Sequence, residues 1–388
     1  MKTHRKLLTV LLCALTLAGL SGCWGARELN ALSLVLGIGI DVKAEEPEMV
    51  YLTAQIVKPD ELKQPSSGGS SGSEAKAYWN MESSGITVFE AIREYTHETN
   101  NKLYDAHNEV IIFGRDAAMG GVQKYLDFFL RAQETRPTTQ IIVSATTAQD
   151  VLNVKPELDK LPAVNIAKLV RAQTFTSQST EITLQKFLNF MLSKTTSAVA
   201  PFVEIRESNG EKLLSINGLA VFKKDKMIGE LGSADARGLM WVSNLVKSGV
   251  IDLHYKDSIV TIEIKNASCT VSPDFSGEKP AMNVKIKEEG VMVSQTGETS
   301  LETVDDLTVL QHLKQAAIYR EVQEALDKAR QMNADFFGFG EIIHKSGYTG
   351  WKQLEEQWDE FFPTMDVNIE VTCTIKAAGN IIKPAVPK

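Results

Sequence analysis

The spacing of apolar and polar residues changes several times along this chain, and each kind of spacing predicts a type of secondary structure. Unbroken apolar runs are typical of buried strands, and apolar residues spaced three and four apart are typical of amphipathic helices. In the first 200 residues the two rhythms alternate, which indicates an α/β or α+β fold. The strands are predicted at 32–41, 49–57, 76–81, 109–113 and 139–144, and the helices at 88–95, 122–130 and 184–192.

Short strands follow residue 200, and a long helix comes after them. The change of rhythm and Pro201 suggest a domain boundary close to that position. Further on, Trp351, Leu354, Trp358 and Phe361 lie at helical spacing, which favours a core stripe over a ligand site. The strands of this part are predicted at 202–206, 213–222, 227–231, 250–255, 259–265, 281–289, 291–295 and 366–375, and its helices at 239–246 and 303–332.

One stretch is of low complexity. Residues 65–73 are almost entirely Ser and Gly, and strand-like sequence resumes at Lys76. Such a composition is flexible. We therefore expect a flexible loop at 60–75 between two strands, with a domain linker as the alternative.

The first 22 residues form a leader that differs from the rest in charge. They hold Lys2, Arg5 and Lys6 and no acid, and an apolar run follows at 7–20, which is the layout of a secretory signal. The 14 residues of this run fall short of the roughly 20 that a membrane-spanning helix needs. The sequence Leu-Ser-Gly-Cys that ends at Cys23 resembles a bacterial lipobox. We expect a diacylglyceryl group on Cys23, whose two acyl chains would hold the mature protein on a membrane without crossing it.

Charge and length limit the class of protein. The 388 residues suggest two or three domains. The whole chain has a net charge of −8, and without the three bases of the leader it has 38 bases against 49 acids, or −11. A body this acidic makes nucleic acid a poor candidate partner. Adhesion to an anionic membrane is therefore expected from the anchor and from protein partners, not from bulk charge.

A search for catalytic and ligand-binding motifs is mostly negative. The chain has no Gly-Lys dipeptide and no Cys-x-x-Cys, so the P-loop and common metal motifs are absent. No catalytic residue, cofactor or metal is predicted, and a metal would require distant histidines to converge in space. The histidines of the mature chain are His97, His107, His254, His312 and His344.

Two pairs of glycines and two cysteines are the remaining candidates for a functional role. Gly37 and Gly39 lie inside a predicted strand, and Gly338 and Gly340 lack the third glycine of a dinucleotide site, so backbone packing or turns are favoured over a contact role. The cysteines that follow the lipobox are Cys269 and Cys373. Two buried free thiols are favoured, and a single disulfide is the alternative.

Several motifs of the mature chain resemble those of the Ger(x)C family, the lipoprotein C subunits of spore germinant receptors. The likeness departs at Gly25-Ala26, where the family usually has an acid, so the contact nearest the lipid stays open. Otherwise it covers nearly the whole mature chain in the family's order. The similar segments are 22–24, 27–30, 36–41, 103–107, 110–114, 128–131, 218–222, 237–239 and 338–341, followed by Trp351 and Trp358.

The resemblance implies a lipoprotein with three mixed sheet-and-helix domains on the outer face of the spore inner membrane. In that family the C subunit works with membrane-embedded A and B subunits in a receptor triggered by small nutrients, and it has no known catalytic activity. Together with the rhythm change near residue 200, the resemblance predicts a signal peptide at 1–22 and α/β domains at 23–198, 199–264 and 265–384.

Two functions therefore stand as hypotheses. The first is a non-catalytic, lipid-anchored subunit that assembles with the A and B subunits. The second is a lipid-tethered binding protein that itself holds a small germinant in a cleft between domains. An enzyme acting on cell-wall material is a more distant third hypothesis.

Overall fold

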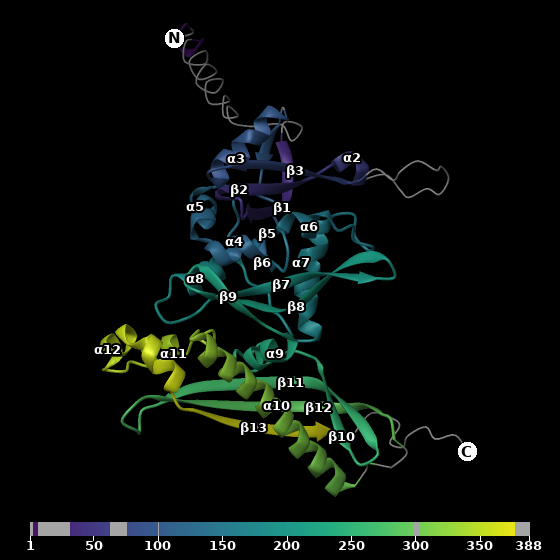
Figure 1. The fold of residues 1–388 in the computed structure, drawn as a ribbon, viewed down its shortest axis with the longest axis vertical. Coiled ribbons are helices and arrows are strands. Elements are labelled where there is room, and N and C mark those ends of the chain that lie inside the picture. The colour runs from purple at the N-terminus through teal and green to yellow at the C-terminus, as the bar shows by residue number, and fades with distance from the viewer. Residues whose placement is uncertain are drawn as a thin grey trace, which may run out of the picture.

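The computed structural model describes residues 3–6, 32–62, 76–99, 101–297, 301 and 303–376. Most of the predicted signal peptide, Cys23 and most of the predicted loop at 60–75 lie outside this part of the chain. The described residues form a mixed α/β protein with a nine-stranded and a four-stranded sheet, which confirms the predicted fold class. Figure 1 shows the larger sheet nearer the N-terminus and the smaller one below it, with α10 lying across it.

The large sheet has four parallel strands at its centre, and antiparallel strands extend it on both sides. Its order is β3-β2-β1-β5-β6-β7-β8-β9, and β4 pairs with the start of β1. The strands β1, β5, β6 and β7 are mutually parallel. The strands are β1 (Leu32–Lys43), β2 (Glu46–Val57), β3 (Tyr78–Gly85), β4 (Lys102–Tyr104), β5 (Val110–Phe113), β6 (Gln140–Ser144), β7 (Val199–Ser208), β8 (Glu211–Lys223) and β9 (Lys226–Leu231).

Helices cover both faces of this sheet, which explains why the central strand β5 is apolar and buried throughout. On one face α6 and α7 pack on Val110, Ile112 and Ile142. The helices α3, α4, α5 and α8 contribute to the cluster on the other face. The helical segments up to this point are α2 (Pro59–Leu62), α3 (Val88–Glu94), η2 (Tyr95–His97), α4 (Arg115–Gly120), α5 (Gln123–Arg131), α6 (Ala148–Asn153), α7 (Pro162–Ala172), η3 (Gln173–Phe175) and α8 (Leu184–Met191).

The glycines of β1 permit this close helix packing. A Cβ on Gly37 would lie 2.7 Å from the Cβ of Ala163 in α7, and one on Gly39 would lie 3.0 Å from the Cβ of Ala148 in α6. Both distances are shorter than ordinary van der Waals contacts. The packing role predicted for these two glycines is therefore confirmed.

The small sheet is covered by one long helix. Its order is β10-β11-β12-β13, and β13 pairs parallel with β12 after the chain has crossed over through α10. Thr303 caps α10, since its hydroxyl oxygen accepts a hydrogen bond from the Asp306 N–H. These elements are β10 (Val250–Tyr255), β11 (Ser258–Asp274), β12 (Ala281–Gln295), α10 (Val304–Met332) and β13 (Val367–Lys376).

The two sheets share a hydrophobic core that is continuous through α9 (Ser233–Val242) and α10. In this joint Arg237 forms a two-pronged ion pair with Glu321, and the indole Nε1 of Trp241 donates to the same carboxylate at 2.8 Å. A Cβ on Gly238 would overlap the carbonyl oxygen of Glu321, so the two helices touch backbone to backbone. The motif at 237–239 thus serves the joint between the sheets.

The large sheet also crosses the position that the sequence suggests as a domain boundary. Pro201 lies inside β7, next to a bulge between Pro201 and Val203, and β7 pairs with β6. A bulge is a place where a strand tolerates a proline. The division into three domains stays a prediction, and its first two units would share this sheet.

Three short helices and a 3₁₀ turn complete the C-terminal part. Trp351, Trp358 and Phe361 are buried, which confirms that the predicted aromatic stripe is core, although two short helices carry it. Gly338 has a positive φ of 75°, and a Cβ on Gly340 would lie 2.6 Å from Thr195, so both glycines serve backbone geometry as predicted. The segments are α11 (Phe339–Lys345), α12 (Trp351–Glu356), α13 (Trp358–Phe361) and η4 (Phe362–Thr364).

Candidate functional site

The predicted lipidation site, Cys23, lies outside the described residues, so lipidation stays a prediction. Cys23 precedes Leu32, the first residue of β1, by nine positions. None of the helices in the described part of the chain combines the length and apolar content that crossing a bilayer requires.

The described residues hold few arrangements typical of catalysis. Within them, no group of three or more His, Cys, Asp or Glu side chains is placed to hold a metal ion. Cys269 and Cys373 are free thiols, as predicted, but only Cys373 is buried and Cys269 is half-buried; they lie on β11 and β13 with β12 between them. Burial raises the pKa of Cys269 to about 11 and that of Cys373 to about 12, so both are expected to stay protonated at neutral pH.

A groove lies between α3 and α5, with a volume of about 1190 Å³. Figure 1 shows the two helices side by side at the end of the large sheet nearer the N-terminus. Val35 and Ile38 of β1 and Leu52 of β2 form its floor. Its walls are two strips at helical spacing. The α5 strip is Lys124, Asp127, Phe128 and Arg131, and the facing strip is Phe89, Ile92, Arg93 and Thr96.

Each of the two walls contributes an aromatic ring, and the two rings lie close together. The ring centroids of Phe89 and Phe128 are 6.2 Å apart, and the side chain of Phe89 remains 52% exposed. The groove therefore offers an open apolar surface between two helices, which is an uncommon feature of a monomeric surface.

Charged side chains surround the mouth of the groove. Arg131 pairs with Asp127 at 2.8 Å, and Lys102 pairs with Glu134 at 2.5 Å. The carboxylate of Asp105 accepts a hydrogen bond from the hydroxyl of Thr135 at 2.6 Å. Each of these charged side chains therefore has an ion-pair or hydrogen-bond partner at the mouth of the groove.

The remaining cations of the groove are Arg93 and Lys124. Arg93 lies over the ring of Phe89 at 4.9 Å, and Lys124 lies over the ring of Tyr125 at 5.0 Å. In the described part of the chain, neither forms an ion pair with a carboxylate. The groove therefore presents positive charge that an acidic group could neutralise.

Helical spacing at 88–95 and 122–130 predicts the two helices, but it does not reveal the groove. Phe89 and Phe128 are far apart in the chain, and only the fold brings them together. The available signal is that each predicted helix carries an aromatic residue with a base four positions away, Phe89 with Arg93 and Phe128 with Lys124.

Two buried aspartates also escape sequence reasoning. Asp41 accepts hydrogen bonds from the N–H groups of Ala148 and Gln149, at 2.7 and 3.0 Å. Asp335 accepts from the N–H groups of Gly338, Phe339 and Gly340. Burial raises the pKa of each carboxyl to about 6, against the opposite effect of these hydrogen bonds. Both aspartates bind the chain's own backbone, which indicates a structural role.

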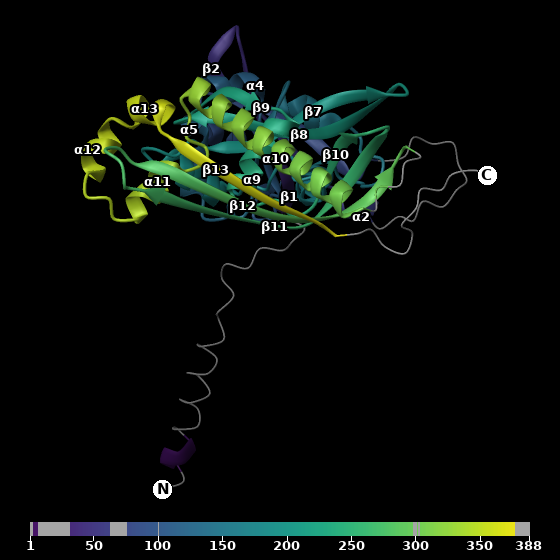
Figure 2. The same cartoon turned by 90° about the horizontal axis from the view of Figure 1, so that it is seen from below.

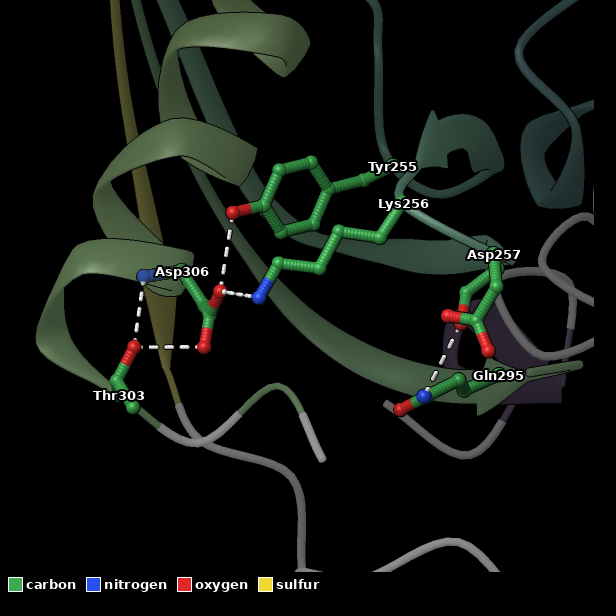
Figure 3. Close-up of polar contacts among 7 residues, drawn as sticks. Tyr255, Lys256, Asp257, Gln295, Thr303 and Asp306 are labelled. Carbon is green, nitrogen blue, oxygen red and sulfur yellow. Dashed lines mark hydrogen bonds and ion pairs between the residues drawn. The ribbon is translucent and has the colours of Figure 1, made fainter. Parts of the chain in front are cut away.

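A polar cluster fixes the start of α10 (Figure 3). The Asp306 carboxylate accepts from Lys256 Nζ at 2.6 Å and from the Tyr255 hydroxyl at 3.0 Å, and the Thr303 hydroxyl donates to it at 2.6 Å. The ammonium of Lys256 is the main reason why the pKa of Asp306 lies well below its usual range. This cluster ties α10 to the β10–β11 turn.

A second, smaller hollow lies beside α12. Its volume is about 430 Å³, and Tyr348, Gln353, Gln357 and Glu360 are among the residues that line it. The ring of Phe275 stacks on Tyr348 with centroids 5.1 Å apart, next to this hollow. Its volume falls in the range of small-molecule clefts, roughly 300–1,000 Å³.

The described residues therefore form a two-sheet α/β protein, and its surface includes a groove and a smaller hollow. Two consecutive family models match it. Residues 25–205 match "Spore germination protein N-terminal domain", and residues 217–379 match "Spore germination B3/ GerAC like, C-terminal". The chain belongs to this spore germination family, the Ger(x)C family that its motifs resemble.

Full-length relatives agree with this assignment. "Putative spore germination protein YfkR" of Bacillus subtilis (strain 168) is 23% identical over 386 residues, which is 98% of each chain. "Spore germination protein KC" of the same strain is also 23% identical, over 97% of this chain and 96% of the relative. The crystal structure of the GerBC protein matches with a TM-score of 0.55 and 18% identity, over 87% of this chain and 96% of that one, and shows that the fold is shared.

Proposed function

We propose that this protein is the lipid-anchored C subunit of a nutrient germinant receptor, and that it acts by assembling with membrane-embedded A and B subunits without catalysing a reaction. The match of two consecutive family models over almost the whole chain carries this proposal. The groove between α3 and α5 supports it, because open apolar surface bordered by charge is typical of protein interfaces.

The expected location is the outer face of the spore inner membrane, and Cys23 is the expected point of attachment. The nine residues from Cys23 to Leu32 could extend at most about 31 Å. A lipid on Cys23 would therefore keep the N-terminal end of the large sheet close to the bilayer.

The anchor is tested by replacing Cys23 with Ala in the full chain. Membrane fractions of spores that make the wild type should hold the protein and its A and B subunits, while the Cys23→Ala variant should appear in the soluble fraction. A variant that stays membrane-bound and supports germination would contradict the anchor. Wild-type protein that never co-purifies with A and B subunits would contradict the assembly role.

Direct binding of a nutrient is the second candidate function, and the hollow beside α12 favours it. Its size and its mixture of aromatic and amide side chains suit a small polar molecule. Titration calorimetry of the lipid-free chain with single amino acids and sugars tests this function. Specific micromolar binding that is lost in Gln353→Ala would support it, and the absence of heat would contradict it.

A further inference from the structure

The α5 wall of the groove has the length and residue spacing of a surface on which a second helix can pack. The α5 wall has nine residues, so it is about 13.5 Å long. Its groove-facing residues Lys124, Asp127, Phe128 and Arg131 repeat at i, i+3, i+4 and i+7. This is the spacing with which one amphipathic helix faces another.

The size and charge of the groove discriminate among possible occupants. A volume of about 1190 Å³ exceeds the roughly 300–1,000 Å³ of small-molecule clefts, so a single nutrient would leave most of the apolar wall open. The floor residues Val35, Ile38 and Leu52 are buried, so a flat bilayer surface would not reach them. An amphipathic helix can enter such a groove, and a few acidic residues on it can neutralise Arg93 and Lys124.

We propose that the α3–α5 groove docks an amphipathic helix of a membrane-embedded partner subunit, with apolar side chains against Phe89, Ile92 and Phe128 and acidic residues beside Arg93 and Lys124. This inference rests on the proposed function, because that function supplies the partner. The bound helix would cover apolar surface that is open in the free chain, and it would pair two cations that lie only over aromatic rings.

Charge reversal at the two cations tests the docking. Arg93→Glu with Lys124→Glu is made in the full lipidated chain and co-expressed with A and B subunits. After detergent extraction, the recovery of A and B subunits with the variant should fall at least tenfold. Both side chains are exposed, so the variant should fold, and its thermal unfolding should match that of the wild type.

A matched control carries the same change of charge elsewhere. Lys212→Glu with Arg320→Glu reverses two exposed bases away from the groove. Recovery of the partners with this control should stay within twofold of the wild type. Equal recovery with the groove variant, the control and the wild type would overturn the docking proposal. No recovery even with the wild type would instead contradict the proposed function.

A photo-crosslink identifies the occupant. With p-benzoylphenylalanine at Phe89, the crosslinked peptide should come from an A or B subunit, in an apolar segment with an acidic residue within one helical turn. The same probe at Phe175, which is 74% exposed and outside the groove, should not label that segment. Crosslinks only to lipid, or only to residues 24–31 of this chain, would overturn the partner-helix proposal.

Discussion

The two sheets bury their apolar side chains in different ways. The centre of the large sheet is covered by helices on both faces, and all four residues of β5 are buried. The small sheet is covered by α10 on one face, and residues of β13 alternate between more and less exposed positions. A strand with helices on both faces therefore has a continuous apolar sequence. In a strand that is covered on one face only, apolar and polar residues alternate.

The sheets also differ in the polar groups that they bury. Lys314 of α10 and Glu288 of β12 form a fully buried ion pair at 2.6 Å in the small sheet. In the large sheet, the buried carboxylate of Asp41 binds backbone N–H groups instead. The small sheet thus buries a charged pair beneath α10, whereas the large sheet buries a carboxylate that binds the backbone of a helix.

Breaking the buried ion pair should have the largest effect on stability. Lys314→Met leaves the Glu288 carboxylate buried without its partner, and we expect the free energy of unfolding to fall by about 3–5 kcal/mol. Guanidinium unfolding of the lipid-free chain measures this loss. The double variant Lys314→Met with Glu288→Leu should recover most of it, and a single variant as stable as the wild type would show that the pair is not buried as described.

Asp41 should make the large sheet sensitive to pH. Because burial raises its pKa to about 6, the folded state binds a proton more tightly than the unfolded state, whose carboxyl titrates near 4. Stability from this group is therefore present at low pH and is lost as pH rises from about 4 to about 6. Relative to Asp41→Asn, the wild type should lose up to about 3 kcal/mol across this range.

Unfolding curves at pH 4, 5, 6 and 7 test this pH dependence. The exposed Asp305 of α10 provides a control, since it is not among the charges that act on Asp41 and Asp305→Asn should leave the pH profile of the wild type unchanged. A difference between wild type and Asp41→Asn that stays constant with pH would contradict the raised pKa.

Overpacking β1 should test the helix packing of the large sheet. In Gly37→Val the new side chain meets Ala163 of α7 and Leu152 of α6, and we expect a loss of about 1–3 kcal/mol. Gly120→Ala is the control, because no atom lies within 4 Å of the added Cβ. Thermal unfolding measures both, and equal effects would show that the close approach of α7 is unimportant.

The smallest effect is expected at the mouth of the groove. The Arg131–Asp127 pair is 79% and 58% exposed, and such exposed pairs contribute little to stability. Arg131→Ala should therefore leave the midpoint of guanidinium unfolding close to that of the wild type. A clear fall in the midpoint would show that this face supports the core, and groove variants would then no longer report binding alone.

Much of the secondary structure could be predicted, and its errors have local causes. No helix is predicted at 162–172, because a proline usually interrupts a helical pattern; in α7 Pro162 lies in the first turn, where proline favours a helix. The strand β12 is predicted in two pieces because Gly290 interrupts the pattern. The strand continues there, and glycine is needed because the side chain of Lys314 occupies the space that a Cβ would take.

The candidate site was less accessible to prediction. Helical periodicity indicates the segments that carry Phe89 and Phe128, but the separation between the two helices depends on how each packs on the sheet. The pairing of Arg131 with Asp127 is a local contact at i and i+4, while that of Lys102 with Glu134 needs the fold. The sequence alone therefore does not show which bases of the groove pair with a carboxylate in the folded chain.

By itself, the sequence determined the family, the mixed α/β class and the order of most elements. These properties depend on local pattern and motif. The tertiary structure alone decided that strands before and after residue 200 share one sheet, that Lys314 and Glu288 meet in a core, and that α3 and α5 leave a groove. Such features arise from contacts between distant residues, whose geometry is set by packing of the whole chain.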